Sequence, residues 1–260
     1  MLVPWIEPAN GHGTAANDRG DDPAAAPRRG PVPPAPLPSP PVRRIMSTAE
    51  RQPQPPAAGH SPYPGALSPD APLEGTASLQ VLSTGYLGGR FASTVSFVRD
   101  GTALIVVNPG MVADIESILR PLGHLGVRPE AVTDVVLLSA RPAHMVNAAL
   151  FPVARLHDAT AVYQNDRKAP RPANGFLVSP SVRLIQTPGH RPDDLTLLVA
   201  TARGIVALTH LWSSRSDSPQ WLPDDDPGAL RQAKTRVLGV ASRIVPAHGA
   251  PFRAGPDTPV

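Results

Sequence analysis

The chain of 260 residues contains no cysteine. This absence excludes disulfide bonds, thiolate zinc sites and a cysteine nucleophile, although it does not fix the cellular compartment. Aromatic residues make up only 4% of the sequence. No stretch approaches the roughly 18 consecutive apolar residues of a membrane-spanning helix. No apolar run follows the twin arginines at 28–29 and 43–44, so we expect no export signal, no membrane association and a cytoplasmic protein.

The chain also lacks a concentrated charge of either sign. Charged residues make up 17% of the sequence and the formal net charge is only +3. The basic residues are scattered and are not interleaved with aromatic residues, as a nucleic-acid-binding surface would require. We therefore expect no nucleic-acid partner, and the sequence leaves the oligomeric state open.

Proline is abundant and unevenly distributed. Of the 35 prolines, 18 lie in the first 75 residues. Because such a segment has too little apolar surface to offset its ordering entropy, we expect residues 1–75 to be disordered. Met46 begins a stretch typical of a protein start, so residues 1–45 are either a genuine tail or the product of a misplaced start codon. The folded domain is then expected at 76–254, with a short tail at 255–260.

From residue 77 onward, short apolar runs alternate with turn signals, which indicates an α/β domain. Helices are expected at 112–125 and 227–240, with a short helix near 144–150. Strands are expected at 79–86, 93–98, 103–107, 133–138, 161–163, 182–186, 195–200, 205–208 and 243–245.

Five short motifs follow apolar runs in this region. They are Val106-Val107-Asn108-Pro109-Gly110, Ser139-Ala140-Arg141-Pro142-Ala143-His144, Thr187-Pro188-Gly189-His190, Ile205-Val206-Ala207-Leu208-Thr209-His210 and Val245-Pro246-Ala247-His248-Gly249. In this order and spacing they resemble the ligand-bearing loops of the metallo-β-lactamase superfamily. The resemblance covers about 77–252 and implies a four-layer αββα sandwich derived from a two-zinc hydrolase. An acidic loop at 214–226, with Trp221, resembles one subgroup of that superfamily.

Compared with the family pattern, several metal ligands are replaced. Ser139, Arg141 and Ala143 stand where the signature has two histidines and an aspartate. Asn108 stands in place of an early aspartate, and His210 in place of the bridging aspartate. Two neighbouring cations repel strongly, and the residues that would offset this repulsion are missing. We therefore expect no dinuclear centre.

Four histidines remain at ligand positions, namely His144, His190, His210 and His248. The resemblance implies that they surround one zinc or another divalent transition metal. The alternative is that they are inherited, hydrogen-bonded pocket residues that hold no metal. Ala143 carries no group that could orient a water, so any hydrolysis is expected to be slow.

Arg141 and Ser139 are the candidate ligand-binding residues of the cleft, since a guanidinium and a hydroxyl can hold an anion. The alternative for Arg141 is an ordinary surface arginine. Gly189 and Gly249 are expected to form tight turns, and His124 and His157 are expected at the surface.

Three functions follow as hypotheses. The first is a weak or inactive hydrolase that binds a small anionic or carbonyl ligand. The second is a mononuclear metal-dependent hydrolase of an ester, lactone or amide. The third is a non-catalytic interaction protein that uses proline-rich segments such as 31–41.

Overall fold

The computed structural model describes residues 68–215 and 226–260. The expectations about disorder and the start codon therefore concern residues that lie mostly outside the described ranges. The same applies to Trp221 and most of the acidic loop. Among the described residues, no helix has the length and continuous apolar character that crossing a bilayer requires.

Seven strands form the first sheet, in the order β1-β2-β3-β4-β5-β6-β7. Strand β3 pairs in parallel with β4, and β4 with β5, whereas the remaining pairs are antiparallel. The strands are β1 (Ser78–Ser83), β2 (Val95–Asp100), β3 (Ala103–Val107), β4 (Asp134–Val136), β5 (Arg155–His157), β6 (Ala161–Gln164) and β7 (Arg167–Pro170).

Six strands form the second sheet, in the order β13-β12-β11-β10-β9-β8. Its only parallel pair among the described strands is β11 with β12. The strands are β8 (Phe176–Ser179), β9 (Val182–Gln186), β10 (Leu195–Thr201), β11 (Gly204–Thr209), β12 (Arg243–Pro246) and β13 (Phe252–Arg253).

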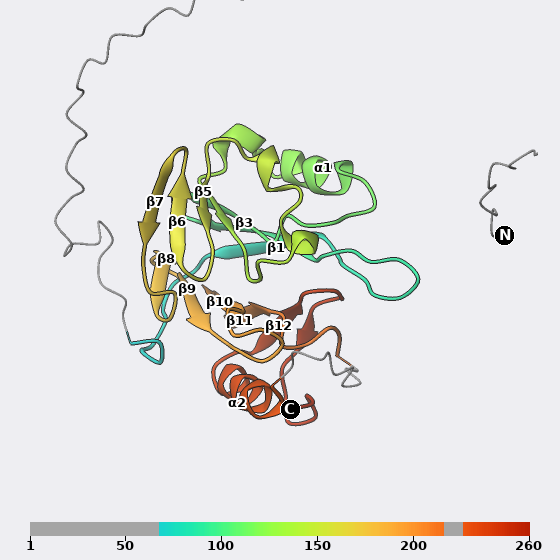
Figure 1. Cartoon of the computed structure of the whole chain (residues 1–260), viewed down its shortest axis with the longest axis vertical. Coiled ribbons are helices and arrows are strands. Elements are labelled where there is room, and N and C mark those ends of the chain that lie inside the picture. The colour runs from blue at the N-terminus through green and yellow to red at the C-terminus, as the bar shows by residue number, and fades with distance from the viewer. Residues whose placement is uncertain (1–67, 216–225) are drawn as a thin grey trace, which may run out of the picture. The chain divides into compact units, whose positions relative to one another are not determined.

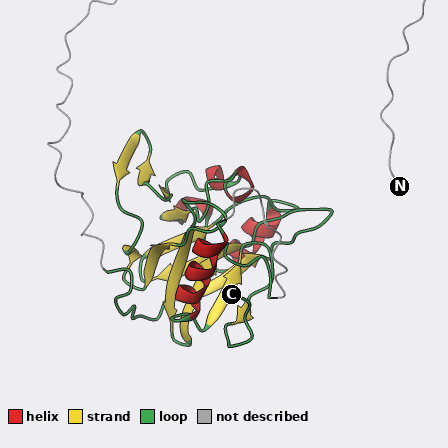
Figure 2. Cartoon of the chain, turned by 60° about the horizontal axis from the view of Figure 1, so that its bottom comes forward, coloured by secondary structure: helices red, strands yellow, loops and turns green. Residues whose placement is uncertain are grey.

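Helices cover the outer faces of the two sheets. Helix α1 (Glu116–His124) lies on the first sheet and α2 (Pro227–Leu238) on the second, as Figures 1 and 2 show. Three 3-10 helices complete the described elements, at Pro129–Ala131, Pro142–His144 and Ala148–Leu150. The expected four-layer αββα sandwich is thereby confirmed.

Three apolar clusters hold the layers together. The central one lies between the sheets and joins Val98 and Val107 of the first sheet to Leu184 and Leu197 of the second. The other two clusters pack α1 and α2 against their sheets. Each fully buried aliphatic side chain contributes about 1.5–3 kcal/mol to this packing.

Most expected elements are present, with shifted ends. The first helix was predicted from 112 but begins at Glu116, whose backbone N–H donates to the Asp114 carboxylate at 3.0 Å. An acidic side chain that binds the backbone in this way favours a turn over another helical turn. The four strands β5, β7, β8 and β13 were not predicted. They are only two to four residues long, too short for an alternating pattern to stand out.

The domain begins earlier than the composition indicates, because residues 68–75 pack against the second sheet and α2. The Arg183 guanidinium donates to the Ala71 and Pro72 carbonyls. Leu73 is buried in the α2 cluster, and Asp70 pairs with Arg236 at 2.8 Å. Within the described residues, the segment 68–75 is therefore packed onto the domain.

The last residues also pack onto the domain. The buried Trp212 indole donates from Nε1 to the Pro259 carbonyl at 2.7 Å, and Thr258 is buried. Residues 255–260, expected as a tail, therefore cover one side of a core tryptophan.

Candidate metal centre

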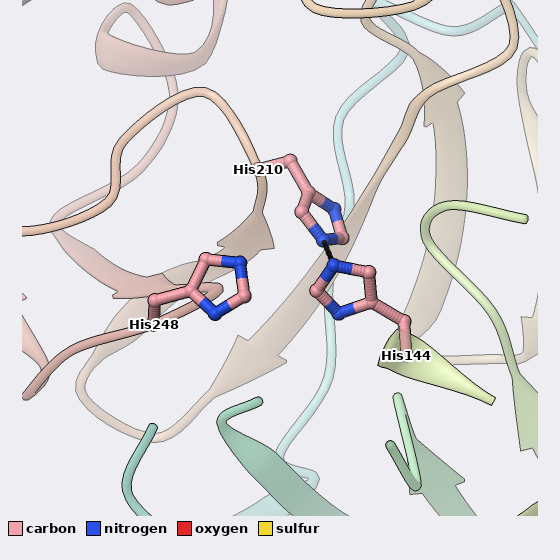
Figure 3. A group of neighbouring side chains, drawn as sticks. All are labelled: His144, His210 and His248. Atoms are coloured by element: carbon pink, nitrogen blue, oxygen red, sulfur yellow. Dashed lines mark hydrogen bonds between the residues drawn. The ribbon is translucent and has the colours of Figure 1, made fainter. Parts of the chain in front are cut away.

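Three histidines from separate segments meet at one end of the sandwich. His210 directly follows β11, and His248 lies two residues after β12. Because β11 and β12 are parallel, their carboxyl ends meet at the same sheet edge. His144 ends the 3-10 helix after β4 and approaches from the first sheet (Figure 3). One ring nitrogen from each histidine lies within 4.8 Å of the other two.

The protonation of His144 follows from its neighbours. The Ser93 hydroxyl lies 2.7 Å from the Ala143 carbonyl and 2.8 Å from His144 Nδ1. Since a carbonyl only accepts, the single hydroxyl proton goes to Ala143, and His144 Nδ1 must donate to Ser93 Oγ. His144 Nε2 is then unprotonated and faces the other two rings.

His248 is oriented in the same way. Its Nδ1 lies 2.9 Å from the Ala92 carbonyl, which can only accept a hydrogen bond. Nδ1 therefore carries the proton, and Nε2 keeps its lone pair. In metal sites, a ligating histidine usually donates its other N–H to such an acceptor, which fixes the ring.

His210 completes the group. Its Nε2 lies 2.9 Å from His144 Nε2, and Figure 3 shows the two rings meeting through these atoms. With His144 Nε2 unprotonated, His210 is the donor in the metal-free form. A tetrahedral zinc with bonds of about 2.0–2.1 Å needs ligand nitrogens about 3.3 Å apart. The His144 and His210 rings therefore need to separate by only a few tenths of an ångström. His210 Nδ1 is buried without a hydrogen-bond partner among the described residues.

Burial keeps these imidazoles neutral. Burial, the His248 imidazole and the Arg141 guanidinium lower the pKa of His144 to about 3. The pKa of His210 is also lowered well below its ordinary value, first by burial and then by His144. Burial likewise lowers the pKa of His248, against the effect of its bond to Ala92. Neutral imidazole is the form that binds metal, so the residues present fit a three-histidine metal site.

His190 is not part of this three-histidine group. It contributes to lowering the pKa of His210 and of Asp194, so it lies near both residues. Arg141 is partly buried, and its guanidinium lowers the pKa of all three grouped histidines and of Asp194.

The positions at which the resemblance implies replaced ligands have structural partners. Ser139 is buried near Asp194, and its hydroxyl lowers the pKa of that carboxylate. Asn108 has a φ of 50°, and its Oδ1 accepts from the Leu138 backbone N–H at 2.8 Å. The Ala143 carbonyl accepts from the Met111 backbone N–H at 2.7 Å. These contacts hold the loops around the three histidines in place.

Sequence reasoning missed Ser93 and Asp194. Ser93 lies just before β2 and has no motif around it, so no sequence signal marks it. Asp194 is the fourth residue after His190, directly before an apolar strand. It is 3% exposed, its Oδ1 has no hydrogen-bond partner among the described residues, and burial raises its pKa. The available sequence signal was an aspartate directly before an apolar run and four residues after a motif histidine.

His157 is not the surface residue that was predicted. It is 1% exposed, and its Nε2 lies 2.7 Å from the Asp134 carboxylate. Asp134 is fully buried and also pairs with Arg155 at 2.8 Å. The unrecognised strand β5 carries both Arg155 and His157, which is why the prediction failed.

Three glycines allow close approach around the centre. A Cβ on Gly110 would lie 2.0 Å from the Ala143 oxygen and 2.6 Å from His144 Cα. Gly189 and Gly249 lack the positive φ of a tight turn. Gly189 instead packs against Leu230 of α2, and Gly249 lies against the Ser213 carbonyl. Both glycines lie in bends of the chain, and the absence of a side chain there serves close packing and not an unusual φ.

Comparison with known proteins agrees with this fold. No family model matches the chain. Metallo-beta-lactamase domain-containing protein 1 of Xenopus laevis is 30% identical over 198 residues, which cover 68% of this chain and 81% of that protein. The human protein of the same name is 33% identical over 159 residues, and the match spans 57% of this chain and 59% of that protein.

Solved structures show the same architecture. A Thermotoga maritima protein, provisionally assigned as a metallo-beta-lactamase, superposes with a TM-score of 0.56 at 19% identity, covering 69% of this chain and 100% of that chain. A protein in a di-iron-bound form gives a TM-score of 0.51 at 18% identity, covering 66% of this chain and 95% of that one. The chain therefore belongs to the metallo-beta-lactamase domain-containing protein 1 family and has the metallo-beta-lactamase fold.

Proposed function

We propose that this chain is a mononuclear metal-binding member of its family that binds a small anionic or carbonyl ligand, with weak hydrolysis at most. The observation that carries the proposal is the arrangement of His144, His210 and His248. Their neutral imidazoles converge, and Ser93 and Ala92 hold two of the Nδ1 protons away from the centre.

One metal fits this site better than two. The described residues offer three grouped ligands, whereas a second cation needs further carboxylates or histidines. The guanidinium of Arg141 lowers the pKa of all three histidines, so its positive charge lies close to the site. A fixed positive charge there repels a second cation. Ser139, which stands where the resemblance implies a histidine, supplies a hydroxyl near Asp194 and no imidazole.

The remaining polar residues of the cleft have separate roles in the proposal. A divalent metal held by three imidazoles supplies Lewis-acid chemistry toward a carbonyl or phosphoryl oxygen. Arg141 binds an anionic group of the ligand, and Ser139 acts through Asp194. Asp194 can exchange a proton with the ligand, but it does not stand at the position of Ala143, where the family pattern has the aspartate that orients the water. Loss of a positioned base costs about 10²–10⁴-fold in rate, which makes hydrolysis slow.

Exposed apolar side chains border the histidines. The Phe91 ring lies 4.4 Å from the His248 ring, and Met145 directly follows His144. Met111 and Val146 are also exposed, at 44% and 53%. An apolar border of this kind favours a ligand whose carbonyl carries an apolar group, such as an ester, lactone or amide.

Metal analysis of the purified protein tests the proposal. We expect close to one metal per chain, lost in His210→Ala and retained in His124→Ala, whose histidine is exposed at the end of α1. Metal-free protein that zinc does not stabilise thermally would refute the metal site.

Substrate and ligand tests then separate binding from catalysis. Metal-loaded protein that hydrolyses none of a panel of apolar esters, lactones and amides has only the binding role. Arg141→Ala is expected to abolish stabilisation by carboxylate ligands while keeping the metal. Unchanged stabilisation would remove Arg141 from the ligand site. The alternative of an interaction protein rests on residues 31–41, which lie outside the described residues.

A further inference from the structure

A second cleft lies at the opposite end of the sandwich from the three histidines. Its volume is about 750 Å³, and it is lined by the start of β1, the turn between β10 and β11, and the starts of β12 and β13. Three arginines, Arg203, Arg243 and Arg253, line it together with apolar residues such as Leu79 and Val206.

This cleft is separate from the candidate metal centre. Strand β11 runs from Gly204, beside the cleft, to Thr209, directly before His210. At about 3.3 Å per residue, the length of β11 separates the two places by roughly 20 Å. No histidine and no other residue of the metal centre lines the cleft.

The three arginines have no acidic counterpart. No Asp or Glu is among the residues that line the cleft, and no ion pair involves these arginines within the described chain. Elsewhere in the domain, Arg155, Arg191 and Arg236 are each paired with an aspartate. The positive charge of the cleft is therefore uncompensated.

Two of these arginines face each other across neighbouring strands. Arg243 of β12 is the direct register partner of Arg253 of β13. Like charges at directly opposite positions destabilise an antiparallel pair. Protection of a sheet edge by positive charge could explain Arg253, because β13 is an edge strand. It does not explain Arg243 on the inner strand or Arg203 in the turn, so an anion that bridges them is the better account.

We propose that this cleft binds a small molecule that carries a diphosphate or two phosphate groups. The planar guanidinium matches phosphate oxygens with paired hydrogen bonds, and three such groups balance a multiply charged anion. The volume lies within the range of about 300–1,000 Å³ typical of small-molecule sites. The partly exposed Leu79, with Ala202 and Ala254, offers apolar surface for the uncharged part of the ligand.

Titration of the full chain with inorganic pyrophosphate, followed by calorimetry, tests the proposal. We expect saturable binding that weakens at least tenfold in Arg243→Gln and stays unchanged in Arg120→Gln, an exposed arginine on α1. Raising the salt concentration should weaken binding. Citrate, which carries carboxylates instead, should bind at least tenfold more weakly.

The His210→Ala variant separates this site from the metal centre. Pyrophosphate also chelates metals, so binding that disappears in His210→Ala would place it at the metal centre and overturn the proposal. Equal binding by wild type and Arg243→Gln, or by pyrophosphate and citrate, would overturn it too. If Arg243→Gln does not fold, Arg203→Gln in the exposed turn takes its place.

The unliganded variants provide a second readout. Without pyrophosphate, Arg243→Gln should melt at a higher temperature than wild type, because it removes a like-charge pair. A lower melting temperature together with unchanged pyrophosphate binding would show that Arg243 serves the structure alone.

Discussion

Ser93 is expected to determine how tightly the centre holds a metal, although it touches no metal itself. Its hydroxyl is fully buried and joins His144 Nδ1 to the Ala143 carbonyl. Ser93→Ala removes the acceptor that keeps the His144 proton on Nδ1. The imidazole can then change tautomer or rotate, and Nε2 no longer points at the centre in a fixed form.

The expected loss of metal affinity is estimated from other metal sites in which a residue accepts the second N–H of a ligating histidine. Loss of a residue that orients a ligating histidine typically weakens metal affinity about 10–100-fold, or about 1.4–2.8 kcal/mol. Competition between the protein and a chromophoric chelator for Zn²⁺ at pH 7.5 measures this change. Ser93→Ala should also lower the free energy of unfolding by about 1–3 kcal/mol in the metal-free protein, because the buried Nδ1–H loses its partner.

Ser96→Ala is a matched control. Ser96 is 1% exposed on β2, and its hydroxyl has no hydrogen-bond partner among the described residues. The substitution makes the same chemical change without touching the histidines, so zinc affinity should not change. The reasoning fails if Ser93→Ala binds zinc as tightly as wild type, or if both variants lose affinity equally.

Three further predictions concern stability. Asp134→Asn should lower the free energy of unfolding by about 1.5–3 kcal/mol in urea denaturation, because it removes the buried carboxylate that is hydrogen-bonded to Arg155 and His157. A change below 1 kcal/mol would contradict that role. Between pH 8 and pH 5 the metal-free protein should lose stability. The pKa of His144 is lowered to about 3, so the unfolded imidazole, with a pKa of about 6.5, takes up a proton that the folded one does not. Below pH 6.5 this histidine alone should lower the free energy of unfolding by about 1.4 kcal/mol for each pH unit of acidification. A free energy of unfolding that does not change with pH would argue against the burial of His144. Gly110→Ala should reduce both metal content and melting temperature, since its Cβ would overlap the Ala143 oxygen. Gly123→Ala in α1, where a Cβ meets nothing within 4 Å, should be neutral or stabilising, and equal losses in both variants would refute this explanation.

The sequence by itself indicated an α/β domain, and the resemblance of its motifs indicated the four-layer sandwich. Apolar runs such as 103–107 and 182–186 match β3 and β9 at both ends, because both strands are largely buried and their apolar pattern is continuous. The order of the short motifs then indicated which family the sandwich resembles. Where strands are short or polar, as in β5 and β7, the pattern carried too little information.

The sequence also indicated which histidines are candidate ligands, but not which of them lie close together. Spacing along the chain placed His144, His190, His210 and His248 at strand ends without distinguishing among them. Only the packing of the two sheets groups three of them within 4.8 Å, and His190 is not in that group. The distinction arises because His210 and His248 follow adjacent parallel strands.

Tertiary structure alone decided the contacts that complete the site and the second cleft. Ser93 lies 51 residues before His144, and no local pattern connects them. Arg243 and Arg253 become neighbours only through strand register. Local sequence fixes which segments are buried, because burial follows the apolar pattern. Which polar atoms then meet depends on how the sheets pack, and no residue specifies that by itself.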